Sequence, residues 1–298
     1  MPGKTAEVHD KLGYATAAEL ILHLPLRYED ETRLTPIRDL RPGLPALVEG
    51  EVAQCDVQYR PRRQLVVEVR EQANADDALA PTLFFRLLHF YPSQQAQLKP
   101  GNRIRLFGEP RQGFHGLEMV HPRYRLVKPG TPLSETLTPV YPTVAGLSQI
   151  AIRKAIAAAM QEADLDEALP TPLLKRLKLP SFEPSLRRLH SPPPDAALAA
   201  LESKTDPAWQ RLKFDELLAQ QLALKRYAQA RHRLAAQALK DERQLIERYL
   251  AGLPFAPTGA QRRAIQEILH DLAGRHPMNR LLQGDVGSGK TLVAAVAC

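Results

Sequence analysis

Residues 284–291 read Gly-Asp-Val-Gly-Ser-Gly-Lys-Thr, which fits the phosphate-binding pattern G-x-x-x-x-G-K-[ST] without deviation. Such a loop works only between a strand and a helix. The strand delivers the chain, the loop N–H groups converge on phosphate oxygens, and the helix N-terminus faces the anion. Residues 280–283 predict the strand and residues 290–297 the helix. The segment therefore predicts the start of a P-loop α/β lobe; a fortuitous glycine-rich turn is the alternative.

The loop assigns roles to individual residues. Lys290 can reach the β- and γ-phosphates of a nucleotide, and the Thr291 hydroxyl can bind Mg²⁺, so these two are the candidate catalytic residues and Thr291 the candidate metal ligand. The remaining loop positions would cradle the phosphates through their backbone N–H groups: Gly284, Asp285, Val286, Gly287, Ser288 and Gly289. A nucleotide with Mg²⁺ is the predicted cofactor.

The segment before the loop, residues 255–261, supports two interpretations that can both hold. Thr258 and Gln261 are spaced three apart before an amphipathic run, which is the pattern of a helix capping box. The carboxamide of Gln261 can also pair with the edge of an adenine. We assign Gln261 and Phe255, which opens the segment, to the candidate nucleotide site.

The region from about residue 46 to residue 128 alternates apolar and polar residues, a pattern typical of half-buried strands. The predicted strands are 46–59, 64–70, 82–90, 102–108 and 116–121, with a short helix at 93–98. Five short strands with a helix between the third and fourth indicate an OB-fold barrel. A five-stranded barrel without a ligand is the alternative.

Basic residues concentrate in the same region. Between residues 99 and 128 seven lysines and arginines face two glutamates. OB-folds bind single strands with cations for the phosphates and aromatic rings for the bases. We expect Phe107, inside a strand, to be core, whereas Phe90 and Tyr91 end a strand and are candidates for stacking. The candidate DNA-contacting residues are Phe90, Tyr91, Arg60, Arg62, Arg63, Arg103, Arg105, Arg111 and Arg123.

Composition narrows the class of protein. A chain of 298 residues with a net charge of +7 has room for about two domains and favours polyanionic partners, nucleic acid before anionic membrane. Its two cysteines form neither a metal motif nor a disulfide framework. The sequence shows no apolar run of about 18 residues and no signal-peptide core. We therefore expect a cytoplasmic protein with reduced thiols and no membrane segment.

The remaining segments complete a multi-domain α+β prediction. Residues 146–160 predict a helix with Ser148 as N-cap, and residues 209–233 predict a long helix. The predicted domains are a helical segment at 1–45, an OB-fold at 46–145, a helical linker at 146–235 and the truncated start of a P-loop (RecA-like) lobe at 236–298.

Several segments together resemble the RecG family of bacterial ATP-dependent DNA helicases. The likeness runs from residues 22–30 (LHLPLRYED) to the P-loop and is carried by 116–124 (GLEMVHPRY), 137–143 (LTPVYPT), 189–195 (LHSPPPD), 213–220 (KFDELLAQ), 255–261 (FAPTGAQ) and 277–294. The resemblance implies a double-strand DNA translocase that remodels stalled replication forks and branched recombination intermediates in DNA repair and recombination. It implies an OB-fold wedge at the branch point, a two-lobed RecA-like motor, and ATP with Mg²⁺ between the lobes.

Carried over by resemblance, Lys290 and Thr291 hold phosphate and magnesium, and Gln261 belongs to the adenine-reading segment. Leu88 occupies a position where the family's wedge has an aromatic residue, so stacking would pass to Phe90 or Tyr91. The implied partners are forks, Holliday-type junctions and single-stranded DNA, with a single-strand-binding protein as a candidate protein partner and no membrane. We expect a monomer.

The family's Asp-Glu segment, arginine-finger segment and second lobe have no counterpart in the sequence. We therefore expect the front portion of such a protein, which binds branched DNA but turns over ATP poorly or not at all alone; steady ATP hydrolysis by the 298-residue chain would refute this. A non-enzymatic OB module that binds single-stranded or branched DNA, with a vestigial P-loop, is the alternative. A kinase or small GTPase would need a nucleotide lobe near the start of the chain, and nothing there supplies one.

Overall fold

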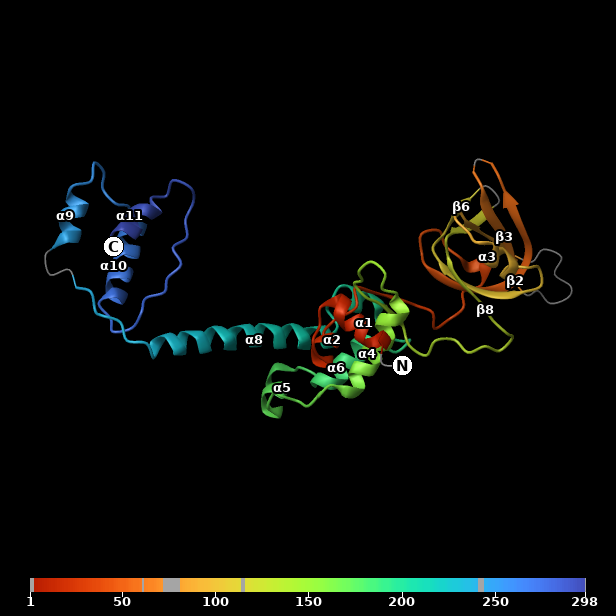
Figure 1. The fold of residues 1–298 in the computed structure, drawn as a ribbon, viewed down its shortest axis with the longest axis horizontal. Coiled ribbons are helices and arrows are strands. Elements are labelled where there is room, and N and C mark those ends of the chain that lie inside the picture. Colours follow the sequence, from red (N-terminus) through yellow and green to blue (C-terminus); the bar gives the residue numbers. More distant parts are fainter. Residues whose placement is uncertain (1–2, 61, 72–80, 114–115, 241–243, 298) are drawn as a thin grey trace. The chain divides into compact units, whose positions relative to one another are not determined.

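The computed structural model describes residues 3–60, 62–71, 81–113, 116–240 and 244–297. The chain divides into two compact units, Met1–Lys213 and Phe214–Cys298, coloured along the sequence in Figure 1. The first unit contains a sheet and a group of helices, and the second contains helices and the P-loop. The protein is thus a mixed α and β protein with more than one compact unit.

Seven strands and one helix make up the sheet region of the first unit. Their bounds are β2 (Ala46–Gln58), β3 (Gln64–Arg70), β4 (Thr82–Leu87), α3 (Pro92–Gln97), β5 (Arg103–Gly108), β6 (Pro110–Gly113), β7 (Gly116–Val120) and β8 (Arg123–Leu126). The strand order is β6-β7-β4-β3-β2-β5-β8. All neighbours are antiparallel except β4 and β7, which are parallel.

Alternation of side chains builds the core of this sheet. Leu83, Phe85 and Leu87 on β4 all point to one face and are at most 3% exposed. In register with them, Val67 on β3 pairs with Phe85 on one side and with Cys55 on the other. These residues belong to one apolar cluster under the sheet, which explains why the periodicity of the sequence located these strands.

The sheet also differs from the prediction. Strands β6 and β8 were not predicted. The sequence of β6, Pro-Arg-Gln-Gly, has no apolar alternation, and β8, Arg-Tyr-Arg-Leu, is only four residues long. These two strands are the edges of the sheet, and no ladder joins them within the described residues. The ladders of the described residues therefore do not close this sheet into a barrel, and the predicted OB-fold barrel is not confirmed by them.

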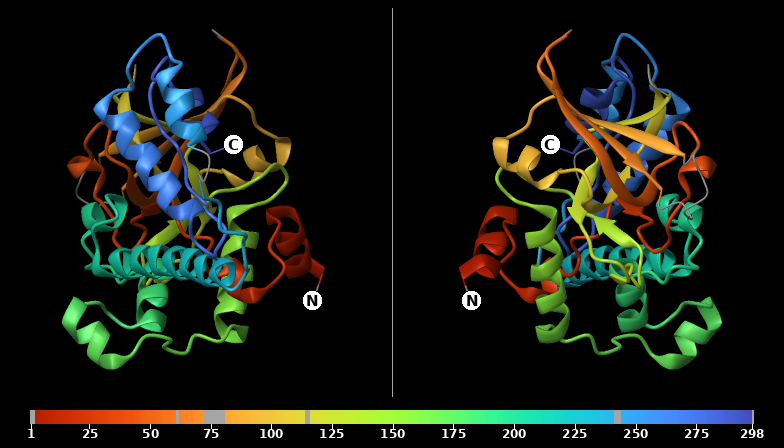
Figure 2. Two further views of the ribbon diagram at one scale, coloured as in Figure 1. Left: turned by 90° about the vertical axis from the view of Figure 1, so that its left-hand side faces the viewer. Right: turned by 90° about the vertical axis from the view of Figure 1, so that its right-hand side faces the viewer.

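The helical part of the first unit uses residues from both sides of the sheet region. Its elements are α1 (Gly3–Leu12), α2 (Ala17–Leu20), β1 (Arg27–Glu29), β9 (Thr138–Val140), α4 (Gln149–Glu162), α5 (Thr171–Leu177), α6 (Phe182–His190), α7 (Leu198–Glu202) and the start of α8 (Pro207–His232). The short helix η1 (Ile37–Asp39) instead packs on the sheet core through Ile37. β1 pairs with β9, and α1 and α2 pack on α4 (Figure 2). Leu20, Ile152, Leu189 and Trp209 share one buried core.

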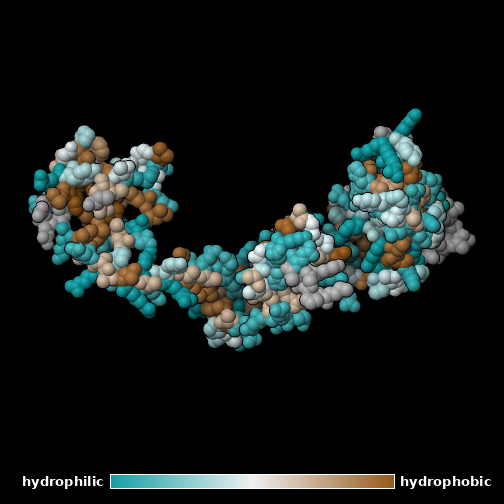
Figure 3. All heavy atoms as spheres, viewed as in Figure 1, coloured by the Kyte–Doolittle hydropathy of each residue, from teal (hydrophilic) through white to brown (hydrophobic). Residues whose placement is uncertain are grey.

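Two local predictions in this part are confirmed. The predicted helix at 146–160 is α4, and the Ser148 hydroxyl accepts from the backbone N–H of Ala151 as its N-cap. The predicted helix at 209–233 is α8. Along α8, Trp209 and Leu212 are buried, whereas Leu217 and Leu224 are exposed. Hydrophobic residues accordingly show at the protein surface along this helix (Figure 3).

The second unit contains α9 (Leu245–Ala251), α10 (Gly259–Leu272) and α11 (Lys290–Ala295). Ile265, Ile268, Val293 and Val296 form its small core. The predicted strand at 280–283 is wrong: these residues are irregular, and Leu281 is 82% exposed. A parallel strand needs a neighbouring strand to bind its N–H and C=O groups, and the described residues of this unit contain none.

Among the described residues, no helix is both long enough and apolar enough to cross a membrane.

Candidate nucleotide-binding loop and nucleic-acid interface

The backbone of the P-loop depends on its glycines. Gly287 and Gly289 have φ angles of +83° and +75°, in the left-handed region that side chains with a Cβ rarely adopt. A Cβ on Gly284 would lie 2.6 Å from the Ser288 Oγ atom. A side chain at position 284 would therefore require the Ser288 hydroxyl to move. The loop ends where α11 begins at Lys290.

Lys290 lies across the loop. Its Nζ donates to the carbonyl oxygens of Gly284 at 2.7 Å and Asp285 at 2.8 Å. Thr291 follows in the first turn of α11 with an exposed side chain. A glycine cradle with a lysine reaching over it and a hydroxyl next to it fits a nucleotide phosphate with a magnesium ion. Val286, at the tip of the loop, is fully exposed.

Gln261 connects the start of α10 to this loop. Its Oε1 accepts from the Thr258 backbone N–H at 2.8 Å, and its Nε2 donates to the Ser288 carbonyl at 2.9 Å. The Thr258 hydroxyl accepts from the Gln261 N–H, which confirms the predicted capping box. Both ends of the carboxamide thus bind the chain itself, and a Cβ on Gly289 would meet Nε2 at 2.5 Å. Phe255 is 57% exposed.

Aromatic and basic side chains gather at one end of the sheet. The Arg63 guanidinium lies 4.5 Å above the centre of the Phe90 ring, a cation–π contact that brings the β2–β3 turn next to the end of β4. Phe90 is half-buried against the sheet core, whereas Tyr91 is 74% exposed. The Tyr91 backbone N–H donates to the Gln94 Oε1 atom at 2.9 Å, which holds the chain while the ring faces solvent.

Sequence reasoning missed one aromatic residue at this end. Tyr59, the last residue before the basic turn, is 72% exposed. The sequence could have identified Tyr59, because an aromatic residue directly after β2 and next to Arg60 has the same arrangement as the other candidates for stacking. We call the set Tyr59, Arg60, Arg62, Arg63, Phe90 and Tyr91 the tip surface. Its three arginines are all exposed.

Arg105 does not belong to an interface, and its assignment to the DNA surface is corrected. It is 3% exposed, and its guanidinium binds the Glu49 carboxylate and the carbonyl oxygens of Thr131 and Pro132. Burial opposes the ionisation of Glu49, but hydrogen bonds from Arg105 and Arg103 outweigh it and hold the pKa of Glu49 below its usual range. Arg105 therefore fastens β5 to β2 and to the loop after β8.

The other three sheet arginines that were predicted to contact DNA also have carboxylate partners. Arg103 binds Glu49 at 2.5 Å and is only 29% exposed. Arg111 binds Glu118 at 2.8 Å but remains 60% exposed. Arg123 binds Glu29 and Glu31 and lies 5.0 Å from the Phe107 ring centre, above a ring that is buried as predicted. The carboxylates that pair with these arginines, Glu49, Glu118, Glu29 and Glu31, all lie outside the tip surface.

Comparison with known proteins places this arrangement in a family. A family profile described as "RecG wedge domain" matches residues 2–162, more than half of the chain. The chain belongs to the RecG wedge domain family. The match includes the whole seven-stranded sheet, the tip surface and α4, and it ends before the P-loop.

Curated relatives extend the RecG likeness to the P-loop. The chain is 41% identical over 305 aligned residues to the ATP-dependent DNA helicase RecG of Pasteurella multocida, with 100% of the chain and 43% of the relative covered. It is 43% identical to that of Escherichia coli K12, with 96% of the chain and 41% of the relative covered. The chain therefore spans less than half the length of these two relatives.

A solved structure described as RecG bound to a three-way DNA junction is similar to the chain with a TM-score of 0.61 and 28% sequence identity. The similarity covers 97% of this chain and 38% of that one.

Proposed function

We propose that the protein carrying this chain is an ATP-dependent DNA helicase that remodels stalled forks and branched recombination intermediates. The observation that carries the proposal is that a RecG wedge domain with an exposed aromatic and basic tip surface shares one chain with a complete P-loop. The two curated relatives described above are named ATP-dependent DNA helicases.

The proposed division of the chain follows from these parts. Residues 46–145 form an OB-fold wedge, residues 1–45 a helical segment, residues 146–235 a helical linker, and residues 236–298 the start of a RecA-like lobe. The seven-stranded sheet with α3 between β4 and β5 supports the OB-fold assignment. The P-loop before α11 supports the assignment of the lobe.

For the nucleotide we propose that the loop from Gly284 to Gly289 holds the phosphates of ATP through its backbone N–H groups. Lys290 would exchange its two loop carbonyls for β- and γ-phosphate oxygens, which are stronger acceptors because they are charged. Thr291 would bind Mg²⁺ through its hydroxyl, and Gln261 and Phe255 would lie toward the base. The roles of Lys290 and Thr291 are electrostatic, because Lys290 and the Mg²⁺ bound by Thr291 would together neutralise the phosphate charge.

For DNA we propose that the tip surface meets the branch point. Tyr91 and Tyr59 would stack on unpaired bases, and Arg60, Arg62 and Arg63 would bind backbone phosphates. The Arg63–Phe90 contact pre-forms part of this surface. Arg111 and Arg123, both about half-exposed and paired with carboxylates, would contribute less, because phosphate must compete with Glu118 or Glu29.

Fluorescence anisotropy tests the proposal by comparing a three-way junction with a single strand of the same sequence at physiological salt. We expect tighter binding of the junction, with an affinity that falls steeply as salt rises because phosphate contacts release counterions. Equal affinity for both DNAs would instead support a plain single-strand-binding module, and no binding to either would refute the proposal.

A further inference from the structure

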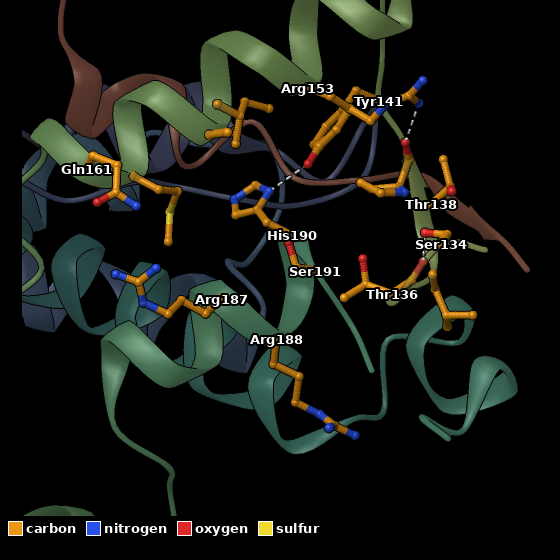
Figure 4. A pocket seen from close by; sticks show the side chains of 15 residues that line it. Ser134, Thr136, Thr138, Tyr141, Arg153, Gln161, Arg187, Arg188, His190 and Ser191 are labelled. Carbon is orange, nitrogen blue, oxygen red and sulfur yellow. Dashed lines mark hydrogen bonds between the residues drawn. The ribbon is translucent and has the colours of Figure 1, made fainter. Parts of the chain in front are cut away.

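Two segments that carry the family resemblance, residues 137–143 and 189–195, contribute neither to the P-loop nor to the tip surface. In the fold they lie together. The Leu137 N–H donates to the Pro192 carbonyl at 2.9 Å, and the Tyr141 hydroxyl lies 2.8 Å from the His190 Nδ1 atom. With α4 and α6 they enclose a half-open pocket of about 620 Å³ (Figure 4). This volume lies within the range of roughly 300–1,000 Å³ of sites that bind small ligands.

The charge of this pocket is one-sided. Three arginines line it, and no Asp or Glu stands among the described residues of its lining. Arg188 is committed to the buried carboxylate of Asp206, which it binds through two nitrogens, at 3.1 and 2.9 Å. The charges that remain for a ligand are those of Arg153 and Arg187.

These two arginines are available for different reasons. Arg153 donates to the Pro139 carbonyl at 3.1 Å, a neutral acceptor that does not offset its charge. Arg187 pairs with Glu183 one turn before it, but both side chains are about half-exposed, so water screens the pair and an anion can replace it. Each guanidinium offers a planar set of donors that suits phosphate oxygens.

The position of the two arginines indicates the shape of the ligand. Figure 4 shows Arg153 on α4 and Arg187 on α6 at different sides of the pocket, with Arg187 on the side of Gln161. The two guanidinium groups are therefore not aimed at one anion. The lining also contains apolar side chains, including Ile156 and Met160 of α4. An extended ligand with separated negative charges and flat apolar groups fits this lining, which is the chemistry of an unpaired nucleic-acid strand.

We propose that this pocket binds a short stretch of single-stranded DNA, with its phosphates on Arg153 and Arg187 and its bases against the apolar wall. The site is separate from the tip surface, and the proposal rests on the proposed DNA binding of the chain. It assigns a second contact for a strand within the first unit.

Anisotropy of a fluorescein-labelled short oligothymidylate on the 298-residue chain tests the pocket. The combined variant Arg153→Gln and Arg187→Gln removes both charges, and we expect binding to be at least about tenfold weaker, since the loss of one charge-assisted hydrogen bond is enough for that factor. Ala157→Phe is the second variant. Ala157 is an exposed residue of α4 that lines the pocket, so a larger ring there fills the space without breaking a bond. We expect the same loss.

Lys154→Gln is the matched control. Lys154 neighbours Arg153 on α4, is exposed and lies outside the pocket lining, so its substitution removes one positive charge from the same helix without changing the pocket, and we expect no change in binding. Both pocket variants binding like the control would overturn the inference, while wild-type chain that binds neither strand nor junction would overturn the proposed function instead. A glutamate-rich peptide that binds in place of the oligothymidylate, with the same sensitivity to Ala157→Phe, would also overturn it.

Discussion

The Tyr141 hydroxyl donates to the Nδ1 atom of His190 across 2.8 Å of buried space. The direction follows from the other ring nitrogen. His190 Nε2 lies 2.8 Å from the carbonyl of Ile21, which can only accept, so Nε2 carries the proton and Nδ1 is the acceptor. The contact joins the segment after β9 to the end of α6, and it fixes His190 as a neutral residue in the core.

This geometry predicts how stability depends on pH. Burial is the main cause that lowers the pKa of His190 from 6.5 to about 4. As the pH falls, the unfolded chain binds a proton at this histidine before the folded chain does. The contribution of neutral, buried His190 to the free energy of unfolding is therefore complete above pH 6.5 and is lost as the pH falls toward 4, by up to roughly 3 kcal/mol. Urea unfolding at a series of pH values, followed by the fluorescence of Trp209, measures this change in the free energy of unfolding. Trp209 is the only tryptophan of the sequence and belongs to the helical core.

His190→Gln keeps a donor and an acceptor but does not titrate. We expect the free energy of unfolding of the variant to depend less steeply on pH between 6.5 and 4 than that of the wild-type chain. Parallel curves for the two chains across this range would contradict the assignment of a neutral buried His190.

A second pH-dependent contact is the ion pair of Glu167 and Arg211. Arg211 is 1% exposed, and its hydrogen bonds hold the pKa of Glu167 at about 2, below its ordinary 4.5. Glu167→Gln leaves a buried guanidinium without its carboxylate, so we expect the free energy of unfolding to fall by about 2–4 kcal/mol at pH 7. The lowered pKa means that the wild-type advantage shrinks as the pH falls from 4.5 toward 2.

Glu183→Gln is the control for this pair. Glu183 pairs with Arg187 at the surface of α6, with both side chains about half-exposed. Its loss should change the free energy of unfolding by less than about 1 kcal/mol. If both substitutions had the same small effect, burial of Arg211 would not matter to stability.

At the tip surface the sharpest substitution is Tyr91→Ala. Tyr91 and Tyr227 are both 74% exposed, but Tyr227 lies on α8, far along the sequence from the sheet. A stacked base contributes about 1–3 kcal/mol, so junction affinity should fall about tenfold for Tyr91→Ala. Tyr227→Ala should leave it unchanged. Equal affinities of both variants in an anisotropy titration would remove Tyr91 from the interface.

For the nucleotide site we expect Lys290→Ala to weaken ATP binding at least about tenfold, since a charge-assisted contact to phosphate is lost. Lys225→Ala removes the same charge from an exposed position of the second unit and should have no effect. Titration with a fluorescent ATP analogue in the presence of Mg²⁺ provides the affinities. Unaltered binding by Lys290→Ala would show that the loop is not the phosphate site.

The sequence by itself determined the local structure. Helix caps at Ser148 and Thr258 involve residues within three positions of each other, and alternation along β4 needs only its own side chains. The P-loop could also be predicted from the sequence, because its glycines are required by local backbone angles and not by contacts with distant residues. The arginines of the tip surface were predicted for a similar local reason, because Arg60, Arg62 and Arg63 lie in the short connection between β2 and β3.

Only the tertiary structure decided what distant residues do to one another. Arg105 and Arg63 are both arginines of the sheet region, and the sequence predicted DNA contact for both. In the structure Arg105 is buried against Glu49, more than 50 positions away, whereas Arg63 is exposed beside Phe90. The pocket between residues 137–143 and 189–195 exists because β9 and α6 fold together. Local backbone preferences act over a few residues and can be read along the chain, whereas burial and charge pairing depend on contacts that form only when the chain has folded.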